Sequence, residues 1–156
     1  MHRKLIALPL AAALGLPLLA QARPVTFTTT LNNYGGDGAY VALYLTDAQG
    51  QYQRTLWVAG KKPKYYTHLR DWARGSGLRQ EEYDGMTGAS ITSGRTLQVT
   101  IDLADALIDS GHQVRVDTAV EDMRDNRSEV VAPLTTEGAG KPVAGKGYVK
   151  TLTYKF

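Results

Sequence analysis

Seven short runs of this chain alternate apolar and polar residues and are rich in β-branched side chains. A period of two places alternate side chains on opposite faces of a strand, so each run predicts a strand with one buried face. Turn-forming residues separate several of the runs, as in hairpins. The predicted strands span residues 24–31, 39–46, 51–59, 95–103, 113–123, 127–134 and 147–156. This pattern predicts an all-β fold, an antiparallel immunoglobulin-like β-sandwich of about seven strands.

The segment from Gly60 to Gly94 interrupts the alternation. It starts with a basic loop, residues 61–64, and continues with an aromatic stretch, residues 65–74, which suits a turn or two of helix. The rest of the segment is rich in glycine. Because long irregular segments inside a compact domain are usually functional or disordered, we expect residues 60–94 to form one irregular excursion that carries function.

The first 22 residues are typical of a secretory signal peptide. A charged start, residues 2–4, precedes an apolar stretch, residues 5–20, and Ala20-Gln21-Ala22 forms an A-x-A cleavage site. The apolar stretch is interrupted by Gly15 and Pro17 and falls short of the roughly 20 residues of a spanning helix, which disfavours a membrane anchor. We therefore expect cleavage after Ala22, a periplasmic location, and one mature domain, residues 23–156.

Composition excludes several kinds of site. The chain has no cysteine, which excludes disulfides, thiolate catalysis, iron–sulfur clusters and c-type haem attachment. The leader contains two of the 18 basic residues, so the mature chain carries 16 basic against 15 acidic residues. Such a balance gives no electrostatic footprint for nucleic acid or an anionic membrane. No nucleophile elbow, P-loop or HExxH motif is present, and we interpret the acidic residues Glu121, Asp122 and Asp125 as a solvated hairpin tip.

One short pattern in the excursion carries specific chemistry. Residues Asp84-Gly85-Met86-Thr87-Gly88-Ala89-Ser90 read as Asp, two variable residues, and then Ser/Thr-Gly-Ala-Ser/Thr. The pattern resembles the acceptor sequence of FAD:protein FMN transferases, which attach FMN to the last hydroxyl through a phosphoester bond. It is similar to that in the FMN-bearing subunits of the sodium-pumping NADH:quinone reductase and of the Rnf complex. The resemblance implies FMN on Ser90, where Thr is commoner, and recognition by the transferase through Asp84, Thr87, Gly88 and Ala89.

The residue types suit an acceptor of this kind. The hydroxyl must lie on an accessible, extended segment, and the two glycines and Ala89 add no bulk beside it. The alternative is a plain surface turn, since Asp-Gly and Thr-Gly form turns readily. Thr92 and Ser93 do not have the acceptor spacing. Together with the amide of Gly94 they are either donors to the FMN phosphate or polar residues that lead into a strand.

Aromatic residues are dense just upstream of the pattern: Trp57, Tyr65, Tyr66, Trp72 and Tyr83. Aromatic faces can cover a flavin ring, with a gain of about 0.5–1.5 kcal/mol beyond burial. Trp57 lies in a predicted strand and is expected in the core. Trp72 and Tyr66 lie outside the predicted strands and serve either to stack on a flavin or simply to pack. His68 and Arg70 either supply positive charge near a reduced flavin or solvate the surface. His68 is not expected to bind a metal, because no second His or carboxylate lies at ligand spacing.

Beyond the pattern, residues 24–156 resemble a bacterial family of predicted periplasmic proteins with no established activity. Its members share a strand-rich domain, an aromatic stretch like residues 65–72, and the acceptor pattern. The resemblance implies an electron carrier with covalent FMN rather than a stand-alone catalyst. It also implies two partners, an FAD:protein FMN transferase and a flavin-carrying membrane reductase of the PepSY type. The alternative is a non-redox binding module that uses the aromatic excursion as its ligand surface.

Overall fold

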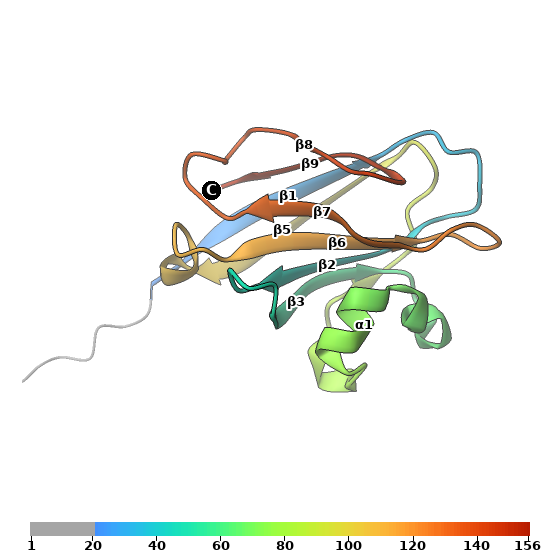
Figure 1. Cartoon of the computed structure of the whole chain (residues 1–156), viewed down its shortest axis with the longest axis horizontal. Coiled ribbons are helices and arrows are strands. Elements are labelled where there is room, and N and C mark those ends of the chain that lie inside the picture. Colours follow the sequence, from blue (N-terminus) through green and yellow to red (C-terminus); the bar gives the residue numbers. More distant parts are fainter. Residues whose placement is uncertain (1–20) are drawn as a thin grey trace, which may run out of the picture.

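The computed structural model describes residues 21–156 and folds them into a β-sandwich (Figure 1). One sheet has four strands in the order β5-β1-β9-β8, and the other has five in the order β4-β3-β2-β6-β7. The strands are β1 (Ala22–Leu31), β2 (Tyr40–Thr46), β3 (Tyr52–Ala59), β4 (Thr87–Gly88), β5 (Thr96–Ala104), β6 (Gln113–Ala119), β7 (Asn126–Pro133), β8 (Val143–Ala144) and β9 (Val149–Lys155). The pairings are antiparallel except that of β3 with β4. The predicted all-β sandwich is confirmed; the predicted leader lies almost entirely outside the described residues.

The seven predicted runs correspond to the seven longer strands, with small differences at their ends. The largest difference is at β6, which ends at Ala119 rather than at Met123. The chain turns there, since the amide of Met123 donates to the carbonyl of Val120 and Asp122 has a φ of 57°. The two remaining strands, β4 and β8, have two residues each, too few to show a period in the sequence.

The main core lies between the two sheets, where the alternating apolar residues of the longer strands meet. In β1, Val25, Phe27 and Leu31 are at most 2% exposed. Leu43 of β2 and Val116 of β6 belong to the same cluster from the opposite sheet. Full burial of such side chains contributes about 1.5–3 kcal/mol each. The two inner faces therefore hold the sheets together and leave the loops at the ends of the sandwich available for a site.

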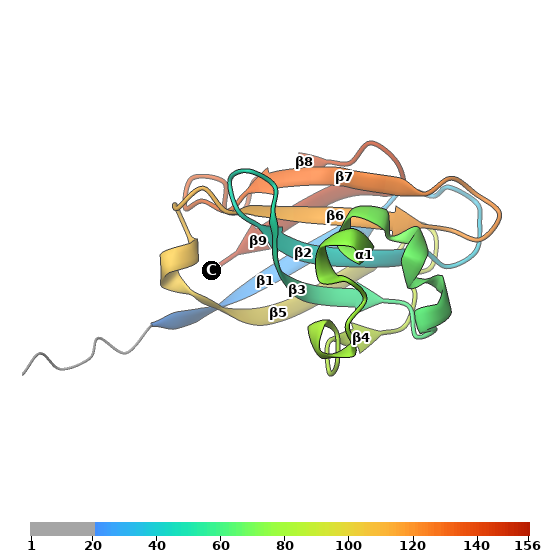
Figure 2. The same cartoon turned by 60° about the horizontal axis from the view of Figure 1, so that its bottom comes forward.

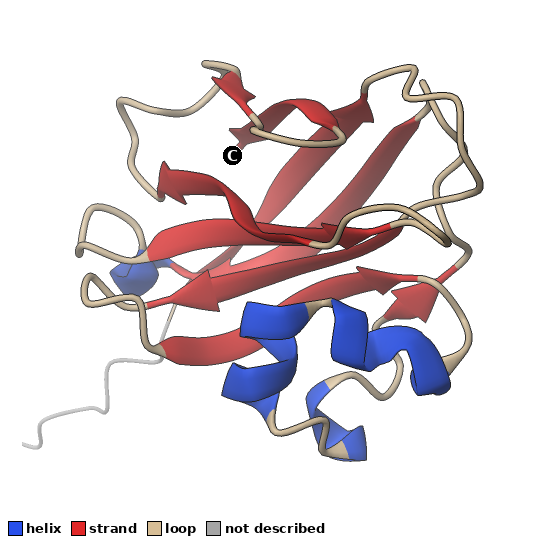
Figure 3. Ribbon diagram, turned by 45° about the vertical axis from the view of Figure 1, so that its right-hand side comes forward, coloured by secondary structure: helices blue, strands red, loops and turns tan. Residues whose placement is uncertain are grey.

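The excursion between β3 and β5 covers the outer face of the five-stranded sheet (Figures 2 and 3). It is more regular than the sequence indicates, with η1 (Pro63–His68), α1 (Arg70–Ser76) and η2 (Gln80–Glu82) in succession. A further short helix, η3 (Asp105–Leu107), follows β5. The excursion and the sheet form a second buried cluster of Ala42, Tyr44, Val58, Tyr66, Leu69, Trp72 and Ala119. This cluster explains why the segment lacks alternation: helical turns, not a strand, pack on the sheet.

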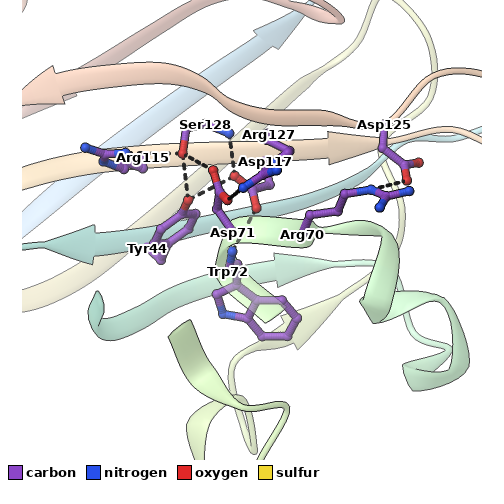
Figure 4. A network of polar contacts seen from close by, with 9 residues as sticks. All are labelled: Tyr44, Arg70, Asp71, Trp72, Arg115, Asp117, Asp125, Arg127 and Ser128. Atoms are coloured by element: carbon purple, nitrogen blue, oxygen red, sulfur yellow. Dashed lines mark hydrogen bonds and ion pairs between the residues drawn. The ribbon is translucent and has the colours of Figure 1, made fainter. Parts of the chain in front are cut away.

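A buried carboxylate fastens α1 to the sheet (Figure 4). Asp117 of β6 is 0% exposed. Its Oδ2 accepts a hydrogen bond from the amide of Trp72 at 2.8 Å, and its Oδ1 accepts from the Tyr44 hydroxyl at 2.9 Å and from the amide of Ser128 at 2.7 Å. Burial raises the pKa of Asp117, and the three donors oppose that rise. The carboxylate thereby fixes the first turn of α1 over β6.

A second carboxylate in the same network lies nearer the surface (Figure 4). Asp71 of α1 accepts from the guanidinium of Arg127 at 2.7 Å and from the hydroxyl of Ser128 at 2.8 Å. Partial burial opposes ionisation of Asp71, but these hydrogen bonds outweigh it and lower the pKa of the carboxyl. The network joins α1 to β7 as well as to β6, which makes the excursion a fixed part of the domain.

Candidate functional site

The acceptor pattern, Asp84–Ser90, contains β4, which is the edge strand of the five-stranded sheet (Figure 2). A turn precedes β4: the amide of Met86 donates to the carbonyl of Tyr83 at 2.9 Å, and Gly85 has a φ of 74°, which glycine adopts without strain. The chain then pairs with β3, where the amides of Val58 and Gly60 donate to the carbonyls of Met86 and Gly88 at 2.9 and 2.8 Å. Backbone hydrogen bonds therefore hold the pattern in place.

Ser90 lies between two points at which the backbone is anchored. On one side, β4 is paired with β3 up to Gly88. On the other, Ile91 is 6% exposed and pairs with Ala39, each amide donating to the other's carbonyl at 2.9 and 2.7 Å. Ser90 itself is exposed, as are Asp84, Thr87 and Ala89. The structure thus presents the serine on a short, fixed and accessible segment.

Gly88 is in close contact with the indole of Trp57. A Cβ atom at Gly88 would lie 2.8 Å from Cζ2 of Trp57, closer than real side-chain contacts allow. Trp57 is half-buried and packs against the main core, as its place in a predicted strand indicates. Its Nε1 is buried and has no hydrogen-bond partner among residues 21–156. The glycine of the pattern is therefore needed for β4 to lie this close to β3.

Gly38, in the loop before β2, fits against Ser90 in a similar way. A Cβ atom at Gly38 would lie 2.7 Å from Oγ of Ser90 and 3.2 Å from its Cβ. Gly38 also lines the larger of the two best-formed cavities in the described part of the chain. Ser90 itself does not line this cavity, but it lies next to a residue that does.

The cavity has a volume of about 690 Å³, within the range of small-molecule sites. Three segments that are distant in the sequence enclose it: the loop into β2, the stretch from η1 into α1, and the β6–β7 hairpin. The lining residues from these segments include Gly38, Tyr40, Tyr65, His68, Arg70, Met123 and Asp125. The fold thus places the loop of Gly38 and the basic residues His68 and Arg70 of the excursion around one cavity.

The cavity wall combines exposed apolar groups with charged side chains, which include Asp37, Glu121, Asp122, Arg124 and an ion pair. Tyr65 is 37% exposed and Met123 is 40% exposed. Across the same wall, Arg70 Nε and His68 Nδ1 lie 3.0 and 3.1 Å from Oδ2 of Asp125, whose side chain is only 12% exposed. The prediction of a solvated hairpin tip is therefore wrong for Asp125, because the basic residues of the excursion fold against it.

A family described as "Predicted periplasmic protein (DUF2271)" matches residues 22–151, which is most of the chain. The chain belongs to this family. The family description agrees with the predicted periplasmic location and names no activity. Neither the curated proteins nor the solved structures include a match.

In this DUF2271 domain, Trp72 and Tyr66 are packed inside the protein. They are 0% and 1% exposed, and their rings meet edge to face with centroids 5.4 Å apart. Trp72 Nε1 donates to Thr55 Oγ1 at 2.8 Å, and the Tyr66 hydroxyl donates to the carbonyl of Gly60 at 2.7 Å. Because neither ring has a face open to a ligand, neither residue can stack on a flavin in this structure. Of the two expected roles, packing is therefore the one that both residues have.

The polar residues after Ser90 are also used within the DUF2271 domain. The Ser93 hydroxyl donates to Oδ1 of Asn33 at 3.2 Å and accepts from the amide of Gly35 at 3.1 Å. The amide of Gly94 donates to the carbonyl of Asn32 at 3.0 Å. These groups tie the start of β5 to the loop after β1, so Ser93 and Gly94 serve the strand rather than an FMN phosphate.

Residues 21–156 show neither a metal-binding cluster nor a membrane-spanning helix. No cluster of three or more His, Cys, Asp or Glu residues has an arrangement that could bind a metal ion. No helix in these residues has the length and apolar character needed to cross a membrane.

Proposed function

We propose that this protein is a periplasmic electron carrier with FMN esterified to the hydroxyl of Ser90. The observation that carries the proposal is the position of Ser90, which is exposed, anchored on both sides by backbone pairing, and next to Gly38 of the cavity wall. The acceptor pattern Asp84–Ser90 supplies the specific chemistry, and the absence of cysteine removes the thiol-based ways to hold a redox group.

The residues around Ser90 fit an attached FMN. Because Gly38 has no side chain, the space beside the Ser90 hydroxyl is free. The adjacent cavity of about 690 Å³ is large enough for a small-molecule cofactor. Thr87 and Asp84 are exposed on the same edge, where an enzyme that reads the pattern can reach them. Accessibility, space and recognition sequence therefore coincide at one position.

Attachment is a group transfer from FAD, catalysed by the FAD:protein FMN transferase. The Oγ atom of Ser90 attacks the phosphorus of the FMN half of FAD. A new P–O bond to Ser90 forms while the phosphoanhydride bond breaks, AMP leaves, and the hydroxyl proton is released. This chain contributes an accessible nucleophile on a segment whose small neighbours, Gly88 and Ala89, add little bulk.

When bound, FMN supplies the redox chemistry, the reversible gain and loss of electrons. The residues of this chain hold it: β4 fixes the attachment segment against β3, and Ile91 fixes the other side through Ala39. The family resemblance makes a PepSY-type membrane reductase the proposed electron donor.

A binding module that uses the aromatic excursion is the second candidate. Of the four aromatic residues between Gly60 and Gly94, Tyr66 and Trp72 are buried and Tyr83 is half-buried, which leaves Tyr65 exposed. A broad aromatic ligand surface is therefore missing. What favours this candidate is the cavity itself, with Tyr65 and Met123 in its wall.

Labelling of the protein in cells tests the proposal. The full chain is co-expressed with an FAD:protein FMN transferase, purified, denatured and examined for flavin fluorescence on the polypeptide and for its intact mass. We expect the mass to increase by one FMN, and we expect Ser90→Ala to abolish the increment. Thr92→Ala, which removes a neighbouring exposed hydroxyl, is the matched control and should be labelled normally. An intact mass without FMN in the unaltered chain would contradict the proposal, and labelling of Ser90→Ala would contradict the site.

A further inference from the structure

The cavity lined by Gly38 has exposed apolar side chains in its wall. Four large hydrophobic residues of the described chain are exposed: Tyr65, Met123, Val131 and Phe156. Tyr65 and Met123 both line this one cavity. A concave site of this volume with exposed apolar groups in its wall is typical of one that binds a small organic ligand.

The aromatic part of the wall is held in a defined orientation. Tyr65 lies edge-on to Tyr40, with ring centroids 5.7 Å apart and planes at 90°. The ammonium group of Lys64 lies 4.9 Å from the centroid of the Tyr65 ring. Tyr65 thus has one partner at its edge and a cation over its face, although it remains 37% exposed. A ring that enters the cavity meets a surface that is already in place.

The polar part of the wall is fixed as well. Arg70 Nε and His68 Nδ1 both lie within hydrogen-bond distance of the same carboxylate oxygen of Asp125, at 3.0 and 3.1 Å. This ion pair joins the β6–β7 hairpin to the excursion and sets where the guanidinium of Arg70 lies. A guanidinium presents several N–H donors, which suit the carbonyl oxygens and ring nitrogens at the polar edge of a flavin.

One residue connects the cavity to the attachment point. Gly38 lines the cavity, and a Cβ atom on Gly38 would lie 2.7 Å from the Ser90 Oγ. A group esterified to Ser90 is therefore tethered beside a residue of the cavity wall, and the flexible ribityl chain of FMN lies between that ester and the ring. Tethering makes occupation of the cavity an intramolecular event with a high effective concentration.

We propose that this cavity holds the isoalloxazine ring of the FMN carried by Ser90, with Tyr65 and Met123 against the ring and Arg70 at its polar edge. The inference rests on the proposed function, since it requires FMN on Ser90. It assigns to the η1–α1 stretch and the β6–β7 hairpin a role in shielding the ring from water. These residues are distinct from Trp72 and Tyr66, which are closed inside the second cluster.

The fluorescence of the tethered flavin tests the inference separately from the attachment. The labelled full chain, with its FMN confirmed by intact mass, is compared with free FMN for emission, anisotropy and quenching by iodide. We expect weak emission, high anisotropy and protection from iodide. Tyr65→Ala and, independently, Met123→Ala should raise emission and iodide access toward those of free FMN while the mass increment stays. Phe156→Ala removes an equally exposed aromatic side chain outside the cavity and should change neither.

The outcomes separate the two proposals. A chain that carries FMN but whose emission and iodide access equal those of free FMN overturns the cavity assignment and leaves the attachment standing. The same conclusion follows if neither cavity variant differs from Phe156→Ala. A chain without the FMN mass increment overturns the proposed function, and the cavity assignment with it.

Discussion

The Oγ atom of Ser90 lies 2.7 Å from the point that a Cβ atom on Gly38 would occupy. This relationship joins two segments with different tasks, the edge segment that presents the hydroxyl and the loop that lines the cavity. Any side chain at position 38 must displace either the Ser90 side chain or the loop. The environment of the hydroxyl is therefore set by a residue outside the acceptor pattern.

Gly38→Ala should slow FMN attachment to Ser90. The added methyl forces the Ser90 hydroxyl into another rotamer or moves the loop, and either change alters the access of the nucleophile to FAD. A time course of the mass increment with purified transferase and FAD measures the rate. Gly36→Ala is the control in the same loop, because its Cβ would meet the flexible side chain of Met123 and the ring of Tyr34 and would not meet Ser90. Equal rates for the two variants would show that the contact with Ser90 is unimportant.

Gly88→Ala should destabilise the domain. Its Cβ would lie 2.8 Å from Cζ2 of Trp57, which packs against the main core, so β4 must move away from β3 and weaken the hydrogen bond from the Gly60 amide. Overpacking of this kind costs about 1–3 kcal/mol. Urea unfolding followed by tryptophan fluorescence measures the loss. Thr87→Ala, at an exposed position in the same short strand, should stay within about 0.5 kcal/mol of the unaltered chain. A Gly88→Ala midpoint equal to that of Thr87→Ala would contradict the close-packing explanation.

The longer strands could be predicted from the sequence because their cause is local. In β1, for example, Val25, Phe27 and Thr29 are buried while Thr26 and Thr28 between them are half-buried, so consecutive residues carry the alternation. The short helix α1 could not be predicted as firmly. It has seven residues, too few for a helical period, and its first turn depends on the carboxylate of Asp117 from a distant strand.

The candidate site was predictable only where a contiguous pattern marks it. Ser90 stands in such a pattern, and its place outside the long strands indicated exposure. The contact with Gly38 and the pairing of Asp125 with Arg70 could not be predicted, since each joins residues far apart in the chain without a sequence signal. The burial of Trp72 escaped prediction for the same reason. Whether an aromatic residue outside a strand is buried depends on whether its segment packs against a sheet, and the local sequence does not show this.

Asp117→Asn should destabilise the domain although it is nearly isosteric. The carboxylate accepts three hydrogen bonds, and the amide nitrogen of Asn would face a donor such as the Trp72 amide. Leaving a buried donor without an acceptor costs about 1–3 kcal/mol. Chemical unfolding measures the cost, and faster hydrogen exchange at the Trp72 amide would locate it at the start of α1. Asp102→Asn, on an exposed position of β5, is the control and should be nearly neutral. If the two variants unfold alike, the network does not hold α1.

Asp71→Asn should reduce stability near neutral pH and have a smaller effect in acid. Hydrogen bonds from Arg127 and Ser128 place the folded pKa of Asp71 below its unfolded value of about 3.9. The contribution of the ionised carboxylate is therefore present above the unfolded pKa and is lost as the pH falls through the folded pKa. We expect a difference of about 1 kcal/mol near neutral pH, since the Arg127 side chain is 49% exposed and the pair is screened. Urea unfolding of both proteins across this pH range measures the difference, with Glu137→Gln, whose side chain is 91% exposed, as a control without effect. A difference that stays constant down to acid pH would mean that the ion pair with Arg127 contributes nothing to the stability of the domain.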